Sequence, residues 1–280
     1  MTTTLGFVGF GEAGSRIAAG LRGEMYAYDI ALNDRMRLRA SEAGVTLVTS
    51  NAELASRCGI ILSLVTAASA LEAAEQNAPH LTADHVYVDG NSVSPALKQK
   101  IAATIESAGA RFVEAAIMAP VPLRQGHLVP MLLNGSGADT LAPFGFQFEK
   151  LEGPWGTAAA VKMCRSIVVK GLEALLTECV LAASHFGAEE RVFESLQRSF
   201  PGITWKELAD YMVNRVSVHG ERRAHEMDEV AETLRSAGIE PIMAEAAARR
   251  QRWAAQMGLA AHFGPQGPAT YREVLALLHQ

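Results

Sequence analysis

The sequence predicts an α/β protein in which a doubly wound, largely parallel sheet is followed by an all-helical C-terminal domain. Short apolar runs alternate with helical patterns through the first 153 residues, an order typical of parallel strands joined by right-handed crossovers. From residue 157 onward the pattern is helical, with almost no strand signal. The length of 280 residues is also more typical of two domains than of one. We therefore expect one domain over residues 1–153 and a second over residues 154–280.

The expected strands are short apolar segments between helical patterns. They cover residues 5–10, 25–30, 46–48, 60–65, 85–89, 111–117, 128–133 and 146–151. The run over residues 60–65 suits a strand that is covered on both faces. Helices are expected over residues 12–22, 67–76 and 94–108, and the last of these opens with Ser94-Pro95, where proline fits the first helical turn.

A glycine motif follows the first expected strand and leads into a helix. Gly9, Gly11 and Gly14 have the spacing G-x-G-x-x-G. The first glycine permits a tight turn, the second lets the backbone approach a pyrophosphate, and the third lets the helix pack on the strand. In this context the motif predicts a Rossmann-type dinucleotide-binding domain. The residues expected to contact the cofactor are Gly9, Gly11, Glu12, Ala13, Gly14, Asp29, Val65, Thr66 and Asn91.

The choice between the two nicotinamide cofactors depends on the end of the second expected strand. Asp29 lies there, about eighteen residues after Gly11. A carboxylate at this place hydrogen-bonds the ribose hydroxyls of NAD and repels the 2′-phosphate of NADP. The sequence therefore favours NAD, although Arg35 and Arg37 follow closely enough to turn toward a phosphate, which keeps NADP open.

The composition narrows the class of partner. The formal net charge of −5 argues against a nucleic-acid or anionic-membrane surface, so a small-molecule substrate is expected. Three scattered cysteines with no C-x-x-C pair predict neither a disulfide framework nor a metal site. The early first strand leaves no room for a signal peptide, and no apolar run approaches the roughly 18 residues of a membrane span, so we expect a cytoplasmic protein.

The oligomeric state is expected to depend on the helical domain. Its long helices, rich in alanine and leucine, predict a homodimer that buries part of their surface. The alternative is that these apolar faces pack within the core of a single subunit.

Further motifs recur at wide spacing along the chain. These are Leu-Ser-Leu-Val at residues 62–65, Asp-Gly-Asn-Ser-Val-Ser-Pro at residues 89–95, the segment 113–120, and Gly-Pro-Trp-Gly at residues 153–156 leading to Lys162. Together with the glycine motif they make the sequence resemble the β-hydroxyacid dehydrogenase superfamily, which includes 6-phosphogluconate dehydrogenase. The segment 170–175 and Arg222-Arg223 are similar to a branch whose helical C-terminal domain is of unknown function.

The resemblance implies that Lys162 is the catalytic general acid/base, acting on a substrate hydroxyl while a hydride passes between the carbinol carbon and the nicotinamide. Desolvation in a closed cleft between the two domains would lower the pKa of the lysine toward neutrality, as this role requires. The alternative is a solvated lysine, although a cation in the first turns of a helix opposes the helix dipole. Ser166, one turn later, and Asn91 are expected to help hold the alcohol oxygen.

Several positions depart from the family pattern. Met118-Ala119-Pro120 stand where many members have a Ser-Gly-Gly turn that binds the substrate carboxylate. Proline donates no N–H and methionine is apolar, so this anion cradle is at least partly lost. Ser166 replaces a frequent asparagine, and its shorter side chain changes the expected geometry. Ser92, Met118 and Ala119 are the candidates for contacts with substrate in this part of the chain.

Two further segments offer substrate contacts. His219 and Arg223 lie at the edges of the apolar stripe of a helix near the C-terminus, where either would meet a substrate carboxylate or hydroxyl. The alternative is a solvated face on which the arginines pair with Glu226 or Glu229. The loop that carries Arg124 and His127 is a similar candidate, with the same alternative of an ordinary surface.

The function expected from these residues is that of an NAD(P)-dependent oxidoreductase acting on a CH–OH group of a small, β-hydroxyacid-like substrate. An imine reductase is the second possibility, because such enzymes resemble this superfamily in architecture, but they generally lack the lysine at position 162. A third possibility, from a different class, is a non-catalytic NAD(P)-binding sensor or interaction protein. The altered turn at residues 118–120 keeps this last alternative open.

Overall fold

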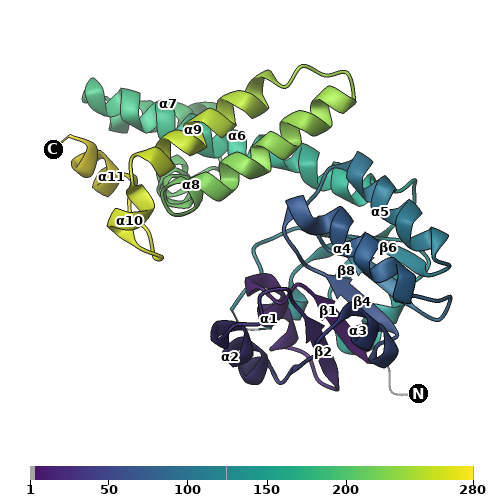
Figure 1. Ribbon diagram of the computed structural model, residues 1–280. Coiled ribbons are helices and arrows are strands. Elements are labelled where there is room, and N and C mark those ends of the chain that lie inside the picture. Colours follow the sequence, from purple (N-terminus) through teal and green to yellow (C-terminus); the bar gives the residue numbers. More distant parts are fainter. Residues whose placement is uncertain (1–3, 124, 280) are drawn as a thin grey trace. The chain divides into compact units, whose positions relative to one another are not determined.

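The computed structural model describes residues 4–123 and 125–279. The chain divides into two compact units, Met1–Lys162 and Met163–Gln280, which we call the N-terminal and C-terminal units (Figure 1). The long helix α6 (Thr157–His185) runs from one unit into the other. The assignment of cofactor binding to residues 1–153, and of substrate binding and oligomerisation to residues 154–280, stays a prediction.

The N-terminal unit is built on an eight-stranded sheet with the order β3-β2-β1-β4-β5-β6-β7-β8. The strands are β1 (Leu5–Val8), β2 (Met25–Tyr28), β3 (Thr46–Leu47), β4 (Ile60–Ser63), β5 (Val86–Asp89), β6 (Arg111–Ile117), β7 (Met131–Asn134) and β8 (Phe148–Leu151). All neighbouring strands pair in parallel except β6 and β7, which are antiparallel. The expected doubly wound, largely parallel sheet is therefore confirmed.

Alternating side chains of these strands face two hydrophobic layers. Leu5 and Phe7 of β1 belong to a cluster that includes residues of α1 (Glu12–Ala18) and α2 (Asp34–Ala43). Val8 faces the opposite side, in a cluster with residues of α3 (Asn51–Arg57), α4 (Ala70–Asn77) and α5 (Pro95–Ser107). Because successive side chains of a strand point to opposite faces, helices are needed on both sides of the sheet.

The ends of the elements differ from the predicted ones by a few residues. The first helix, expected over residues 12–22, ends at Ala18. Gly20 follows, and a Cβ atom there would lie 2.0 Å from His127 Nδ1, so the chain approaches its neighbour closely at this point. Short 3₁₀ segments, Ala67–Ser69, Ala78–His80, Gly126–Leu128 and Ala138–Phe144, complete the connections.

In the described residues of the C-terminal unit, all regular secondary structure is helical. Besides α6 it contains α7 (Glu189–Ser199), α8 (Trp205–Ser236), α9 (Ile242–Gln256), α10 (Leu259–Phe263) and α11 (Tyr271–Leu278). One apolar cluster joins Met163 of α6 with Met227 of α8 and Ala247 of α9, and a second includes residues of α7, α10 and α11. Within the described part of the chain, no helix is long and apolar enough to cross a membrane.

Candidate functional site

The glycine motif lies where the direction of strand order reverses. β1 is flanked by β2 on one side and by β4 on the other, and in open α/β sheets ligands bind outside the carboxyl ends of the strands at such a point. Gly9 has φ +81°, and a Cβ atom there would lie 2.8 Å from Leu64 O. At Gly14 it would lie 3.0 Å from Gly9 O, whereas at Gly11 it would meet nothing within 4 Å. The loop is thus tight at Gly9 and Gly14 and open at Gly11, where a pyrophosphate requires space.

The residues that follow the glycine loop complete this edge of the sheet. Gly11 is the N-cap of α1, so the first amide groups of the helix are oriented toward the open space. Ala13 is half-buried, and the exposed Glu12 forms an ion pair with Arg16 one turn later. The geometry of this glycine loop therefore fits a bound dinucleotide.

Asp29 lies just after β2 and supports the glycine loop. Its Oδ2 accepts a hydrogen bond from the backbone N–H of Phe10 at 2.7 Å, and its Oδ1 accepts one from Ala31 N–H at 2.8 Å. Each carboxylate oxygen can accept more than one hydrogen bond, so the group retains acceptor capacity toward ribose hydroxyls. Asp29 therefore connects the glycine loop to the place where the adenosine ribose is predicted to bind.

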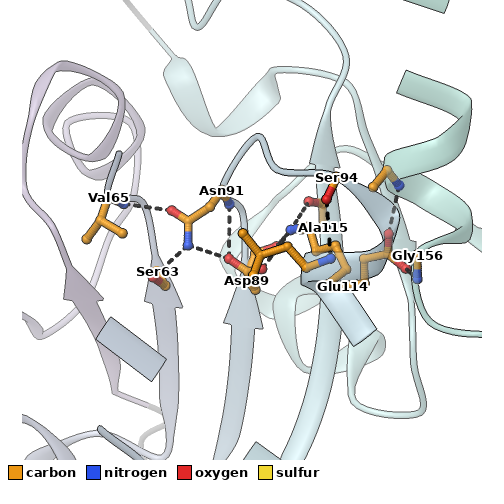
Figure 2. A network of polar contacts seen from close by, with 11 residues as sticks. Ser63, Val65, Asp89, Asn91, Ser94, Glu114, Ala115 and Gly156 are labelled. Atoms are coloured by element: carbon orange, nitrogen blue, oxygen red, sulfur yellow. Dashed lines mark hydrogen bonds and ion pairs between the residues drawn. The ribbon is translucent and has the colours of Figure 1, made fainter. Parts of the chain in front are cut away.

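A buried polar network connects the ends of β4 and β5 (Figure 2). Asn91 Oδ1 accepts from Val65 N–H at 2.7 Å, while Asn91 Nδ2 donates to Ser63 Oγ at 3.0 Å and to Asp89 Oδ1. Asn91 is only 4% exposed. Both amide hydrogens of Asn91 are therefore donated within the protein. These contacts fix the loops after β4 and β5 relative to each other.

Lys98 of α5 completes this network at Asp89, the last residue of β5. Its ammonium donates to Asp89 Oδ2 at 2.8 Å, to the backbone oxygen of Asp89 at 2.6 Å and to the backbone oxygen of Ala115 at 3.3 Å. The two side chains are 1% and 0% exposed, so the ion pair is fully buried. The ion pair fixes the carboxyl end of β5 to β6, directly beside the loop that bears Asn91.

The start of α6 is held by a second buried carboxylate. Glu114 of β6 accepts hydrogen bonds from Gly156 N–H at 2.9 Å and from Ala159 N–H at 2.7 Å (Figure 2). Negative charge at a helix N-terminus satisfies unpaired amides and interacts favourably with the helix dipole. Asn134 of β7 also donates to the backbone oxygens of Gly153 and Pro154, so the segment leading into α6 is fixed from two strands.

Lys162 follows on the second turn of this capped helix. It is half-buried and belongs to the N-terminal unit, three residues after Ala159. Val65 is half-buried and Thr66 is exposed, directly after β4, and Ser92 is half-buried after β5. Thr66 Oγ1 lies 3.0 Å from Ser69 Oγ. The cofactor-binding candidates thus gather at the carboxyl ends of β1, β2, β4 and β5.

The turn after β6 and the segment that follows it contain the other candidates of this unit. Met118 is half-buried, and its N–H donates to Pro130 O at 2.9 Å, whereas Ala119 is exposed. Arg124 lies outside the described residues. His127 is half-buried and packs against Gly20, and its Nδ1 has no hydrogen-bond partner among the described residues.

Ser166 belongs to the C-terminal unit and takes part in a different set of contacts. It is buried, and its Oγ accepts a hydrogen bond from Lys170 Nζ at 3.0 Å. Lys170 also forms an ion pair with Glu226 of α8 at 3.0 Å. Burial acts to raise the pKa of the Glu226 carboxyl, but Lys170 and Arg222 together lower it. The predicted hydrogen bond of Ser166 to a reacting oxygen stays a prediction.

Arg223 pairs across helices rather than along its own. Its Nη1 lies 2.8 Å from Glu173 Oε1 of α6, and Gln251 of α9 donates to the other oxygen of that carboxylate at 3.0 Å. All three side chains are buried. The sequence left open whether Arg222 or Arg223 pairs with Glu226, and the ion pair is made by Arg222.

His219 occupies a break in α8. Its backbone angles, φ −124° and ψ 15°, are not helical. Burial lowers the pKa of the imidazole to about 4, and the charges of Arg215, Arg222 and Arg223 act in the same direction. At neutral pH the side chain is therefore uncharged, and it lies beside Arg223 in the C-terminal unit.

Three residues of these networks are not among the sequence-predicted candidates. Asp89, Lys98 and Glu114 hold the strand ends and the start of α6. Glu114 offered a signal, because a carboxylate inside the apolar strand Arg-Phe-Val-Glu-Ala-Ala-Ile must find buried donors. Lys98 offered none, since it lies in a helix segment that contains another lysine at position 100.

Comparisons with known proteins agree with this architecture. Residues 4–131 match the family model described as the NAD binding domain of 6-phosphogluconate dehydrogenase, and residues 183–254 match a domain of unknown function. A conserved hypothetical protein from Sinorhizobium meliloti 1021 is 37% identical, with a TM-score of 0.79, over 97% of this chain and 94% of that one. The conserved protein MTH1747, described as structurally similar to 3-hydroxyacid dehydrogenases, is 32% identical with a TM-score of 0.76, over 91% of this chain and 98% of that one.

More distant structures share the fold alone. A 3-hydroxyisobutyrate dehydrogenase from Mycobacterium tuberculosis is 16% identical, with a TM-score of 0.75 and complete coverage of both chains. A reductive aminase from Aspergillus terreus is 14% identical, with a TM-score of 0.60, over 98% of this chain and 100% of that one.

The fold and the matched N-terminal model define a Rossmann-type protein whose cofactor is NAD(P). The chain belongs to the β-hydroxyacid and 6-phosphogluconate dehydrogenase-like superfamily, in the branch whose helical C-terminal domain is of unknown function.

Proposed function

We propose that the protein is an NAD(P)-dependent oxidoreductase that transfers a hydride between the nicotinamide and a CH–OH carbon of a small, β-hydroxyacid-like substrate. The observation that carries the proposal is the cap on α6. The buried Glu114 fixes the start of this helix, and the half-buried Lys162 lies on its second turn. A lysine anchored in this way has the defined position that proton transfer requires.

In this proposal NAD(P) supplies or accepts the hydride, and the residues of the chain bind it and move the proton. The open space at Gly11 and the N-terminus of α1 receive the pyrophosphate, while Asp29 receives the ribose hydroxyls. Asn91 and Asp89 hold the loops after β4 and β5 in place. Lys162 takes the hydroxyl proton during oxidation and returns it during reduction.

We further propose that NAD is preferred to NADP. The carboxylate of Asp29 is fixed by two backbone amides, so it cannot turn away from a 2′-phosphate without losing both hydrogen bonds. Repulsion between the carboxylate and the phosphate then disfavours NADP.

The test of the proposed reaction is a turnover screen of hydroxyacids, other alcohols, aldehydes, ketones and imines with NAD(H) and NADP(H). For an active substrate, Lys162→Ala should lower kcat by about 10²–10⁴-fold while NADH affinity is unchanged. Lys100→Ala, which removes an exposed lysine of α5, is the matched control and should retain full activity. Turnover that survives Lys162→Ala would contradict the assigned role, turnover confined to imines would support the imine-reductase alternative, and tight cofactor binding without any turnover would support the sensor.

We also propose a homodimer formed through the helical region. Val168, Leu175 and Ala182 recur every seven residues on α6, and all three are exposed, which is the spacing of a helix seam that packs against another helix. Light scattering should give twice the chain mass of 29.9 kDa for the unaltered protein and a smaller mass for Leu175→Glu. The exposed-site control Glu207→Lys should leave the mass unchanged, and a monomeric unaltered protein would contradict the proposal.

A further inference from the structure

One face of α8 carries three basic side chains at four-residue spacing. These are Arg215, His219 and Arg223. Arg223 is buried, whereas Arg215 and His219 are half-buried, so the group extends from the interior of the C-terminal unit to its surface. The backbone departs from helical geometry at His219, in the middle of the group. Next to it, Gly220 packs closely on α9, where a Cβ atom would lie 2.6 Å from Gln251 O.

The charges around this face do not balance. Glu173 pairs with Arg223, and Glu226 pairs with both Lys170 and Arg222. Arg215 makes no hydrogen bond or ion pair with any residue in the ranges 4–123 and 125–279. Two carboxylates therefore face four cations, namely Lys170, Arg215, Arg222 and Arg223. Of these four cations, Arg215 is the one that forms no ion pair among the described residues, and its charge acts on Glu173, which is already paired.

Two donors of the group also lack acceptors. The Nε atoms of Arg215 and Arg223 are both buried, and neither has a hydrogen-bond partner among the described residues. A buried charged donor without an acceptor is costly, so such groups are normally paired. The neutral imidazole of His219 lies between the two arginines in the sequence of the helix and can donate to or accept from a ligand.

We infer that Arg215, His219 and Arg223 form a binding site for a small-molecule oxyanion, the carboxylate or phosphate group of a ligand. Guanidinium groups bind both kinds of oxyanion through charge-assisted hydrogen bonds with directed N–H groups. An oxyanion here accepts from N–H groups of the half-buried Arg215 and offsets its charge. This assigns ligand binding to the C-terminal unit, which goes beyond the hydride transfer proposed for the residues around Lys162.

The test follows the imidazole resonances of His219 by NMR in the full-length protein. The signal is assigned by its loss in His219→Gln, and inorganic phosphate and acetate are titrated separately at constant ionic strength. NADH is present in excess, so that the glycine loop is not itself titrated by phosphate. We expect a saturable shift of the His219 signal and a rise in the pKa of His219, because a bound anion offsets the field of the arginines.

Variants of Arg215 then test the assignment. Arg215→Met should weaken binding of the probe at least tenfold, and Arg215→Lys should restore part of it. Arg235→Met removes an exposed arginine of the same helix and should bind like the unaltered protein. Stronger binding of phosphate identifies a phosphate ligand, and stronger binding of acetate a carboxylate.

The inference is overturned if neither probe gives a saturable shift of His219, or if Arg215→Met binds as tightly as the unaltered protein. Should Arg215→Met fail to fold, the titration of the unaltered protein still decides. Because His219 reports only on its own surroundings, the result can be separated from a failure to bind NADH or to turn over a substrate.

Discussion

Replacing Lys98 by methionine tests the buried network that holds the strand ends. The substitution keeps an aliphatic side chain of similar length but leaves the Asp89 carboxylate, which is 0% exposed, without its cation. Removing one partner of a buried ion pair costs about 3–5 kcal/mol, because the remaining charge is neither solvated nor paired. For a unit of about 160 residues each kcal/mol lowers the unfolding midpoint by about 2–4 °C, so we expect a loss of roughly 6–20 °C.

The matched control is Lys150→Met. Lys150 pairs with Asp139, but these side chains are 56% and 71% exposed. Exposed pairs contribute only about 0–1 kcal/mol, so the midpoint should fall by less than about 4 °C. Both variants are compared by thermal unfolding and by NADH titration. Lys98→Met should also weaken NADH binding, because Asp89 supports Asn91, which in turn fixes the Val65 amide.

A double variant separates the buried charge from the lost hydrogen bonds. Adding Asp89→Asn to Lys98→Met removes the uncompensated carboxylate but keeps an oxygen that accepts from Asn91 N–H. The double variant should therefore be more stable than Lys98→Met alone. The reasoning is refuted if Lys98→Met is no less stable than Lys150→Met, or if the second substitution brings no recovery.

Three further predictions concern other groups. Asp29→Asn should weaken NADH binding about tenfold or more, because a charged hydrogen-bond acceptor is lost, and should weaken NADPH binding less. A larger loss of NADPH affinity than of NADH affinity in titrations would contradict the NAD preference. The pKa of His219 is lowered to about 4 by burial and by Arg215, so the unfolded chain takes up a proton between about pH 6.5 and 4 that the folded chain does not, and stability falls as the pH falls. Unfolding midpoints should fall less over this range in His219→Gln, and identical slopes would argue against a depressed pKa. Burial raises the pKa of Cys58 to about 12, so a maleimide at pH 8 should modify the exposed Cys164 but not Cys58 in the native protein, as peptide mass spectrometry can check.

The sheet could be predicted from the sequence because its strands are short apolar runs between glycine-rich turns. β6 begins and ends as expected, at Arg111 and Ile117. The helix after the glycine motif was predicted four residues too long: it ends at Ala18, and Gly20 just beyond it lies against His127, more than a hundred residues away in the sequence. Local patterns indicate where an element forms more reliably than where it ends, and a close approach of distant residues such as this one is not visible in them.

The polar residues were harder to interpret than the apolar ones. Asn91 was predicted to hydrogen-bond a substrate hydroxyl or the nicotinamide amide, which stays a prediction; the sequence did not indicate that its amide hydrogens are donated to Ser63 and Asp89. Arg223 was predicted to lie at the edge of an apolar stripe; its side chain is buried, and its partner Glu173 lies fifty residues earlier, on another helix. Helical spacing identifies partners along one helix and gives no information about partners across helices.

The two buried carboxylates of the N-terminal unit give the proposed site a common support. Asp89 and Glu114 are paired in register on the neighbouring strands β5 and β6. Asp89 holds the loops on the cofactor side through Asn91, and Glu114 holds the helix that bears Lys162. The position of Lys162, the proposed general acid/base, relative to the loops after β4 and β5 is therefore set by hydrogen bonds of Asp89 and Glu114 on two adjacent strands. Because a packed parallel sheet is the most rigid part of such a fold, this arrangement provides the fixed geometry that hydride and proton transfer need.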